Sequence, residues 1–162
     1  MGIREQLTPE AWKAVYNAPF AAAVYVTASS GSYTEERLER RSANKVIKDT
    51  LKQGGGQYGD LVAAIVTDMN AMSGKDKKAI TVQYKQWGLE MMRGEAWMLV
   101  DRAVKALKDR PGLDGFKQWV MDVARHAAET SRGGLLSMTG DTPLDNQEIF
   151  ALTEIERIFA GE

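Results

Sequence analysis

Apolar residues recur at intervals of three or four along almost the whole chain, whereas the period-two alternation of a half-buried strand is absent. This spacing predicts about seven amphipathic helices, separated by clusters of glycine, serine and proline. The apolar positions that define them span residues 12–27, 38–51, 61–72, 80–91, 97–107, 116–130 and 149–159. Stripes of this length can bury one shared core, so the sequence predicts an all-α fold, a single compact bundle occupying residues 1–162.

Local signals refine where these helices begin and end. Thr8-Pro9-Glu10 combines a hydroxyl cap, a proline at the first helical position and an acid near the positive end of the helix dipole. Pro19 lies within the same stripe and predicts a kink or a split. Gly94 is expected to separate the fourth helix from the fifth, and the Gly-, Ser- and Thr-rich stretch 131–143 is expected to be a loop.

Composition removes several classes of function. The chain lacks cysteine, which excludes disulfides, thiolate metal sites and cysteine nucleophiles. Its 21 basic and 22 acidic side chains give a net charge of −1, so the basic excess typical of nucleic-acid binding is missing. The basic run within 37–48 is interleaved with acids, which favours a solvated helix face. We therefore expect no nucleic-acid partner.

The sequence contains no stretch of 18 apolar residues, so no transmembrane segment is expected. The charged N-terminal residues do not resemble a signal peptide, and the expected location is cytoplasmic.

Three features that could carry chemistry have simpler interpretations. His126 is the only histidine and lies at the edge of a predicted stripe, which favours a partly buried or surface role over catalysis. Gly54–Gly59 has neither a preceding strand nor a following lysine, so a flexible helix connection is favoured over a phosphate loop. Met91, Met92 and Met98 could line an adaptable groove, although packing in the core is the favoured interpretation. The sequence therefore predicts no catalytic residue.

Acidic residues gather at two helix starts. Glu35 and Glu36 follow a glycine turn before the second helix, and Asp141, Asp145 and Glu148 follow another before the seventh. Carboxylate oxygens can bind a hard divalent cation. The same residues also stabilise helix N-termini without any ligand, by about 0.5–1 kcal/mol each, and Asp145 with Glu148 forms a capping-box pattern. Capping is favoured by local physics, and the metal site is the more specific hypothesis.

The outline of an alanine-rich helix, a glycine turn, an apolar residue, a cap, an acid and a further helix occurs early and again late in the chain. It resembles the tellurite-resistance TerB-like proteins, with the best likeness in the stretch 116–131 and in Gly140–Ile158. The opening Leu7–Trp12 with Ala18–Phe20 resembles that group as well. The resemblance implies a pseudo-duplicated bundle, an acidic metal site between the two repeats, and a role in bacterial stress response.

The leading hypothesis is therefore a non-enzymatic bacterial helical protein that acts through protein association and acidic metal binding. Its candidate ligands are Asp141, Asp145, Glu148, Glu35 and Glu36, with a divalent cation as the cofactor. The first alternative is an oligomeric or partner-binding module without metal, which would use the Met- and Trp-rich helices over 80–107. A further alternative is a small-molecule-binding protein or an enzyme, with a pocket near Trp87 or Trp97.

Overall fold

A computed structural model describes residues 2–29, 36–84, 87–136 and 146–161. Within these ranges the fold is all-α, as the sequence predicts, and no strand occurs. The elements are α1 (Ile3–Gln6), α2 (Pro9–Ser29), α3 (Glu36–Gln53), the 3₁₀ turn η1 (Gly56–Tyr58), α4 (Asp60–Ala71), α5 (Gly74–Ile80), α6 (Leu89–Leu107), α7 (Leu113–Leu136) and α8 (Asn146–Ala160). None of the described helices has the combination of length and apolar character needed to cross a membrane.

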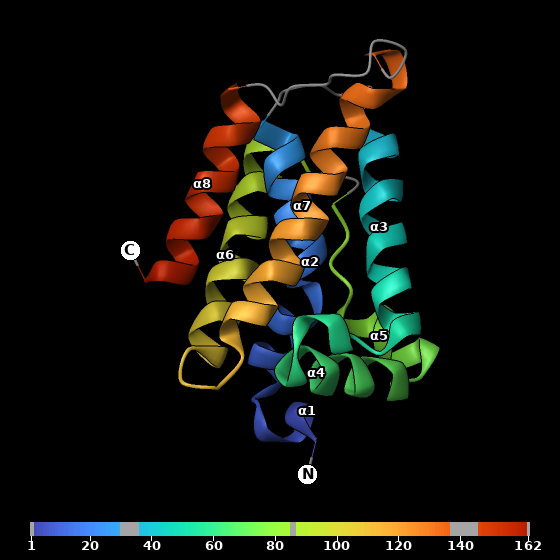
Figure 1. Ribbon diagram of the computed structural model, residues 1–162, viewed down its shortest axis with the longest axis vertical. Helices are drawn as coiled ribbons and strands as arrows, with labels where there is room; N and C mark the ends of the chain where they lie inside the picture. The colour runs from blue at the N-terminus through green and yellow to red at the C-terminus, as the bar shows by residue number, and fades with distance from the viewer. Residues whose placement is uncertain (1, 30–35, 85–86, 137–145, 162) are drawn as a thin grey trace.

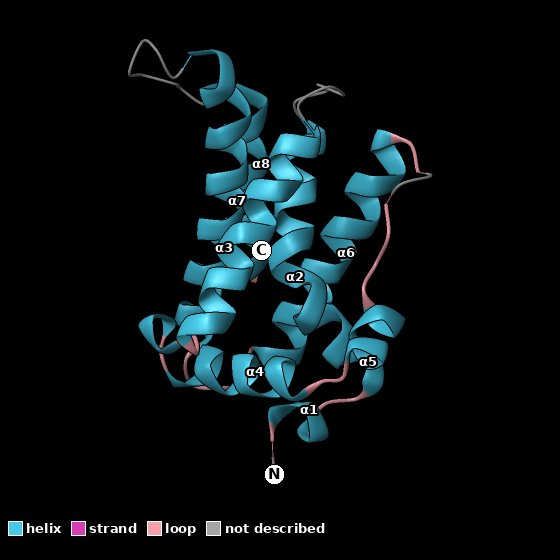
Figure 2. Ribbon diagram, turned by 90° about the vertical axis from the view of Figure 1, so that its right-hand side faces the viewer, coloured by secondary structure: helices cyan, strands magenta, loops and turns pink. Residues whose placement is uncertain are grey.

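Five long helices, α2, α3, α6, α7 and α8, form the body of a bundle (Figure 1). Helix α4 lies across one end of it, which we call the base, and the short α1 and α5 lie beside α4 (Figures 1 and 2). At the opposite end α3, α6 and α8 begin, while α2 and α7 point towards it with their C-termini (Figure 1). The bundle therefore has a closed base and an end at which several helix termini gather.

Helix α2 is the centre of the bundle and packs against α3, α6, α7 and α8. Fourteen of its 21 residues are buried, including small residues at Ala14, Ala18, Ala21 and Ala22. Small side chains let neighbouring backbones approach closely, and a helix covered on every side does not need a polar face. The alanine-rich sequence of α2 therefore reflects its central position.

The sequence makes one prediction at the start of α2, at Thr8, and another at Pro19 within the helix. The backbone N–H of Ala11 donates to Thr8 Oγ1 at 3.1 Å, which confirms the predicted helix start. Pro19 is buried within a helix that continues from Pro9 to Ser29, so the predicted split does not occur. Proline removes one helical hydrogen bond, and packing of the surrounding residues on four helices offsets that loss.

The predicted fourth helix, over residues 80–91, is wrong. Helix α5 ends at Ile80, the next residues are not helical, and α6 begins only at Leu89. The chain must travel from α5 at the base to the start of α6 at the other end (Figure 1). Extended backbone covers about 3.3 Å per residue whereas a helix covers about 1.5 Å, so the non-helical residues 81–84 carry the chain along the bundle in fewer residues than a helix would need.

Two further boundaries differ from expectation. Helix α6 runs through Gly94, because the buried stripe formed by Met92, Ala96, Leu99 and Val100 continues on both sides of it. A glycine within a helix costs about 1 kcal/mol, which such a stripe easily offsets. Helix α7 extends to Leu136, so the first six residues of the predicted loop 131–143 are helical.

The glycine-rich turn between α3 and α4 is packed against its neighbours. Gly55 has φ +74°, and a Cβ at that position would lie 2.9 Å from Val66 Cγ2 on α4. Tyr58 donates a hydrogen bond of 2.9 Å to Asp122 Oδ2 on α7. A Cβ at Gly115 would overlap the carbonyl oxygen of Tyr58. The turn connects two helices, as predicted, but it is fixed by close contacts and does not stand free.

Candidate functional site

Most of the predicted cation ligands lie outside the residues that the structure describes. Glu35, Asp141 and Asp145 lie outside the described residues. Glu36 is the first residue of α3, at the same end of the bundle as the start of α8, but its side chain is not described (Figure 1). Glu148 alone is described in full. Among described residues, no group of three or more acids, histidines or cysteines is placed to hold a metal ion.

Glu148 lies in the first turn of α8, where its side chain is 1% exposed. The buried positions of this helix are Glu148, Ala151, Leu152, Ile155 and Ile158. The predicted inward position of Ile149 is therefore wrong, since its side chain is 49% exposed. The α8 stripe begins one residue earlier than hydrophobicity alone suggests, and a carboxylate occupies the place of an apolar side chain.

Large apolar side chains that remain exposed are confined to two neighbouring helices of the described structure. They are Met91, Trp97 and Met98 on α6, and Ile149 and Phe150 on α8. Helices α6 and α8 pack against each other and run in the same direction (Figure 1). We call this set of five residues the α6–α8 face after the two helices that carry it, with Ile149, seven residues before Glu156, on the side of α8 that faces α7. It is the strongest candidate for a functional surface.

The prediction that the methionines pack in the core is correct for Met92 and wrong for Met91 and Met98. Met92 is 2% exposed, while Met91 is 64% and Met98 is 41% exposed. Residues seven apart return to nearly the same side of a helix, so Met91 and Met98 share a side. The sequence contains this signal, because the buried stripe through Met92, Ala96 and Leu99 lies well away from both residues.

Behind the α6–α8 face, a buried tyrosine joins three helices. Tyr25 on α2 is 5% exposed, and the guanidinium carbon of Arg93 on α6 lies 5.3 Å from the centre of its ring. Burial raises the pKa of Tyr25, and the nearby Glu154 carboxylate on α8 raises it further, while Arg93 acts in the opposite direction. The tyrosine therefore stays neutral and links α2, α6 and α8.

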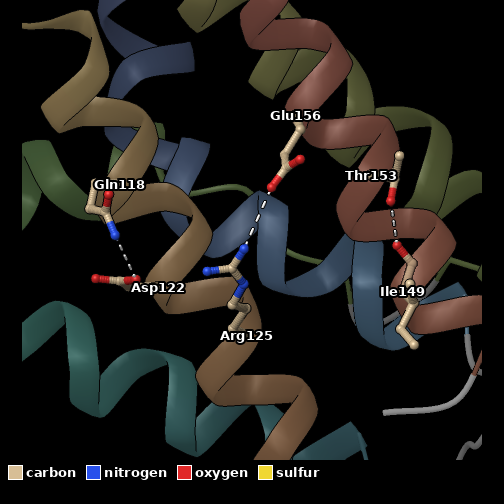
Figure 3. Close-up of polar contacts among 6 residues, drawn as sticks. All are labelled: Gln118, Asp122, Arg125, Ile149, Thr153 and Glu156. Atoms are coloured by element: carbon tan, nitrogen blue, oxygen red, sulfur yellow. Dashed lines mark hydrogen bonds and ion pairs between the residues drawn. The ribbon is translucent and has the colours of Figure 1, made fainter.

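A second contact holds α8 on its other flank. Arg125 Nη2 on α7 lies 3.5 Å from Glu156 Oε1 on α8, and Figure 3 shows these two side chains meeting across the gap between the helices. Both side chains are about half exposed, so the ion pair contributes at most about 1 kcal/mol. Ile149 and Thr153 lie along the same helix, where Thr153 Oγ1 donates to the Ile149 carbonyl at 2.9 Å (Figure 3). Helix α8 is thus held on both flanks.

A groove of about 570 Å³ lies between the second half of α6 and the end of α8. Trp97 and Phe159 contribute apolar surface to it, and Lys105 and Lys108 contribute cations. Lys105 Nζ is 2.8 Å from Asp101 Oδ2. Cations near the C-terminus of a helix are stabilised by the helix dipole without any ligand, so these lysines do not by themselves indicate an anion site.

His126 is exposed on α7, in agreement with a surface role, and its backbone carbonyl accepts a long hydrogen bond of 3.5 Å from Ser42 Oγ on α3. The contact thus uses the backbone of His126 and not its ring.

Comparison of the chain with protein-family models, with curated proteins and with solved structures gave no match. The surface chemistry of the described residues is therefore what supports a function.

Proposed function

We propose that this chain is a non-enzymatic helical protein that acts by association, and that its α6–α8 face is the associating surface. The observation that carries the proposal is the confinement of the five large exposed apolar side chains to α6 and α8 in the described structure. Full burial of such a side chain from water contributes about 1.5–3 kcal/mol, and these five, which are 38–64% exposed, would gain roughly half of that in an interface. A non-enzymatic role agrees with the stress-response role that the TerB-like resemblance implies.

A second copy of this chain is the occupant that the charges favour. The net charge of −1 leaves little repulsion between copies. The same two helices carry exposed charges of both signs, with Glu90 and Arg102 on α6 and Arg157 on α8. A surface with both signs can complement itself across a two-fold axis, as symmetric dimers require.

Sedimentation analysis over a range of protein concentrations tests this proposal. The wild-type chain should form dimers, and Met91→Ser with Met98→Ser should raise the dimer dissociation constant by at least about tenfold, since the two side chains lose their burial. The matched control is Lys45→Ser with Lys48→Ser, two exposed positions on α3 that should leave the constant unchanged. A wild-type chain that stays monomeric up to about 1 mM would contradict self-association through this face.

The acidic helix starts support a second candidate, a divalent-cation site formed by residues near the starts of α3 and α8. Both helices begin at the same end of the bundle (Figure 1). Calcium, magnesium or zinc at millimolar concentration should then raise the melting temperature by more than about one degree, because binding to the native state stabilises it. Glu148→Gln should abolish that increment. If none of the three ions shifts the wild-type melting temperature, the cation site is excluded.

A further inference from the structure

The extended segment that follows α5 forms one wall of a second cavity, far from the α6–α8 face. The cavity has a volume of about 250 Å³ and lies between α2, α3, the end of α4 and residues 81–83. Figure 2 shows the segment rising from α5 along the outer edge of the bundle. The backbone of an extended chain is thinner than a helix, so it covers the neighbouring surfaces of α2 and α3 incompletely and leaves this cavity.

The wall is held in place by Asn17, which is 5% exposed on α2. Its Nδ2 donates to the Ile80 carbonyl at 2.9 Å, and its Oδ1 accepts from the Val82 N–H at 3.0 Å. Beyond the cavity, Tyr84 is buried with its ring centre 6.3 Å from that of Phe20. The segment is therefore fixed on both sides of the cavity, which gives the cavity a preformed shape.

The lining combines apolar side chains with the uncharged polar side chains of Tyr16, Asn17, Asn44, Thr81 and Gln83. Phe20, Ile47, Leu51 and Val82 supply aromatic and aliphatic surface, and all four are half-buried. The described residues that line the cavity include no charged side chain. A charged ligand would lose its hydration here without a compensating partner, which is costly, so the chemistry selects an uncharged molecule.

Two hydroxyl groups form a polar corner. Thr81 Oγ1 donates to the Lys77 carbonyl at 2.6 Å and lies 3.3 Å from the hydroxyl oxygen of Tyr16. A hydroxyl has one proton and two acceptor positions. Since the Thr81 proton is used on Lys77, the Tyr16 hydroxyl donates to Thr81 Oγ1, and the pair keeps acceptor positions for a third partner. A hydroxyl group on a ligand can donate to one of these acceptor positions.

We propose that this cavity is a binding site for a small uncharged molecule, with an aromatic or branched aliphatic body against Phe20 and Ile47 and one hydroxyl group at Tyr16 and Thr81. Its volume lies just below the roughly 300–1,000 Å³ of ligand pockets, which fits a molecule of about ten non-hydrogen atoms. The site is independent of the α6–α8 face, so either proposal can fail without the other.

Benzyl alcohol is a suitable probe, with benzoate and benzylamine as charged compounds of the same size. Benzyl alcohol should bind with a dissociation constant on the order of 1 mM, and at about ten times that concentration it should raise the melting temperature by roughly 3–5 °C. Amide chemical shifts should change around Thr81–Gln83 and the facing turn of α3. The two charged compounds should bind at least about tenfold more weakly.

Variants separate this site from non-specific binding. Tyr16→Phe and Thr81→Val should each weaken benzyl alcohol about fivefold, the effect of one hydrogen bond. The matched control is Thr153→Val, because Thr153 makes the same hydroxyl-to-carbonyl bond within α8 but lies outside the cavity lining. Shift changes that centre elsewhere, equal binding of the charged compounds, or no binding at about 20 mM would each overturn the proposal.

Discussion

Two of the described connections between helices are each held by one polar side chain. Tyr58 fixes the turn between α3 and α4 through Asp122 at 2.9 Å, and Asn17 fixes the segment between α5 and α6 through two backbone groups. The difference lies in the space around them. At the turn a glycine Cβ would overlap a neighbour, whereas beside the segment a cavity of about 250 Å³ remains. Closely packed connections transmit strain, and loosely packed ones leave room for ligands.

The largest expected effect is at Gly115, where the turn meets α7. Gly115→Ala places a methyl group on the carbonyl oxygen of Tyr58, so the backbone must move and the Tyr58–Asp122 bond is strained. We expect a loss of about 3 kcal/mol in the free energy of unfolding, measured by urea denaturation.

Gly94→Ala is the matched control for that variant. No atom outside its own helix lies within 4 Å of a Cβ at Gly94, and the residue is in the middle of α6. This substitution should stabilise the protein by about 0.5–1 kcal/mol, since alanine favours the helix. Equal destabilisation by the two variants would show that the turn is not packed as described.

Asn17→Ala should have the next largest effect. It removes both contacts to the segment and leaves the Val82 N–H and the Ile80 carbonyl without that partner. Buried groups that lose a partner cost about 1–3 kcal/mol, so we expect a loss of about 2–3 kcal/mol. Hydrogen exchange at Val82 should accelerate with it. The exposed Asn44 lines the same cavity, and Asn44→Ala should change the free energy of unfolding by less than about 0.5 kcal/mol.

Tyr58→Phe should have the smallest effect, about 1 kcal/mol, because a single hydrogen bond is lost and the ring keeps its place near Trp119. Burial, followed by the hydrogen bond to Asp122 and the charge of Asp122, raises the pKa of Tyr58 to about 12. The neutral tyrosine is thus favoured in the folded state. Its contribution is complete below about pH 10, the pKa in the unfolded chain, and is lost as the pH rises towards 12.

Urea denaturation between about pH 8 and 11 measures this dependence. The wild-type protein should lose stability above about pH 10 more steeply than the Tyr58→Phe variant. Tyr25, whose pKa is also raised, contributes to the slope of both proteins and therefore cancels in the comparison. Parallel slopes would show that Tyr58 is not held by Asp122.

Periodicity predicted the helices well wherever one side of a helix faces solvent. The described positions of the α4 and α7 stripes are buried as expected, and Thr8 caps α2 as its sequence predicts. It failed over residues 80–91, because Tyr84 and Trp87 pack on the core from backbone that is not helical. The end-to-end distance that this segment must span depends on tertiary structure and leaves no local signal.

The candidate surfaces were only partly accessible to sequence reasoning. The sequence favours core positions for Met91 and Met98, since hydrophobicity does not distinguish a buried stripe from an exposed apolar one. Asn17 visibly interrupts an apolar helix between Ala14 and Ala18, but the sequence does not show which backbone groups it contacts. The position of Glu148 in the core could not be predicted, because acids at helix starts are usually solvated.

The central place of α2 has a consequence for synthesis. This helix leaves the ribosome early, but three of its four partner helices begin at Leu89 or later. At about 5–20 residues per second, the chain needs roughly 3–12 seconds between completing α2 and reaching α6. During that interval a helix with no polar side has little to cover it, so nascent chains should depend on chaperone binding at α2 until translation passes α7.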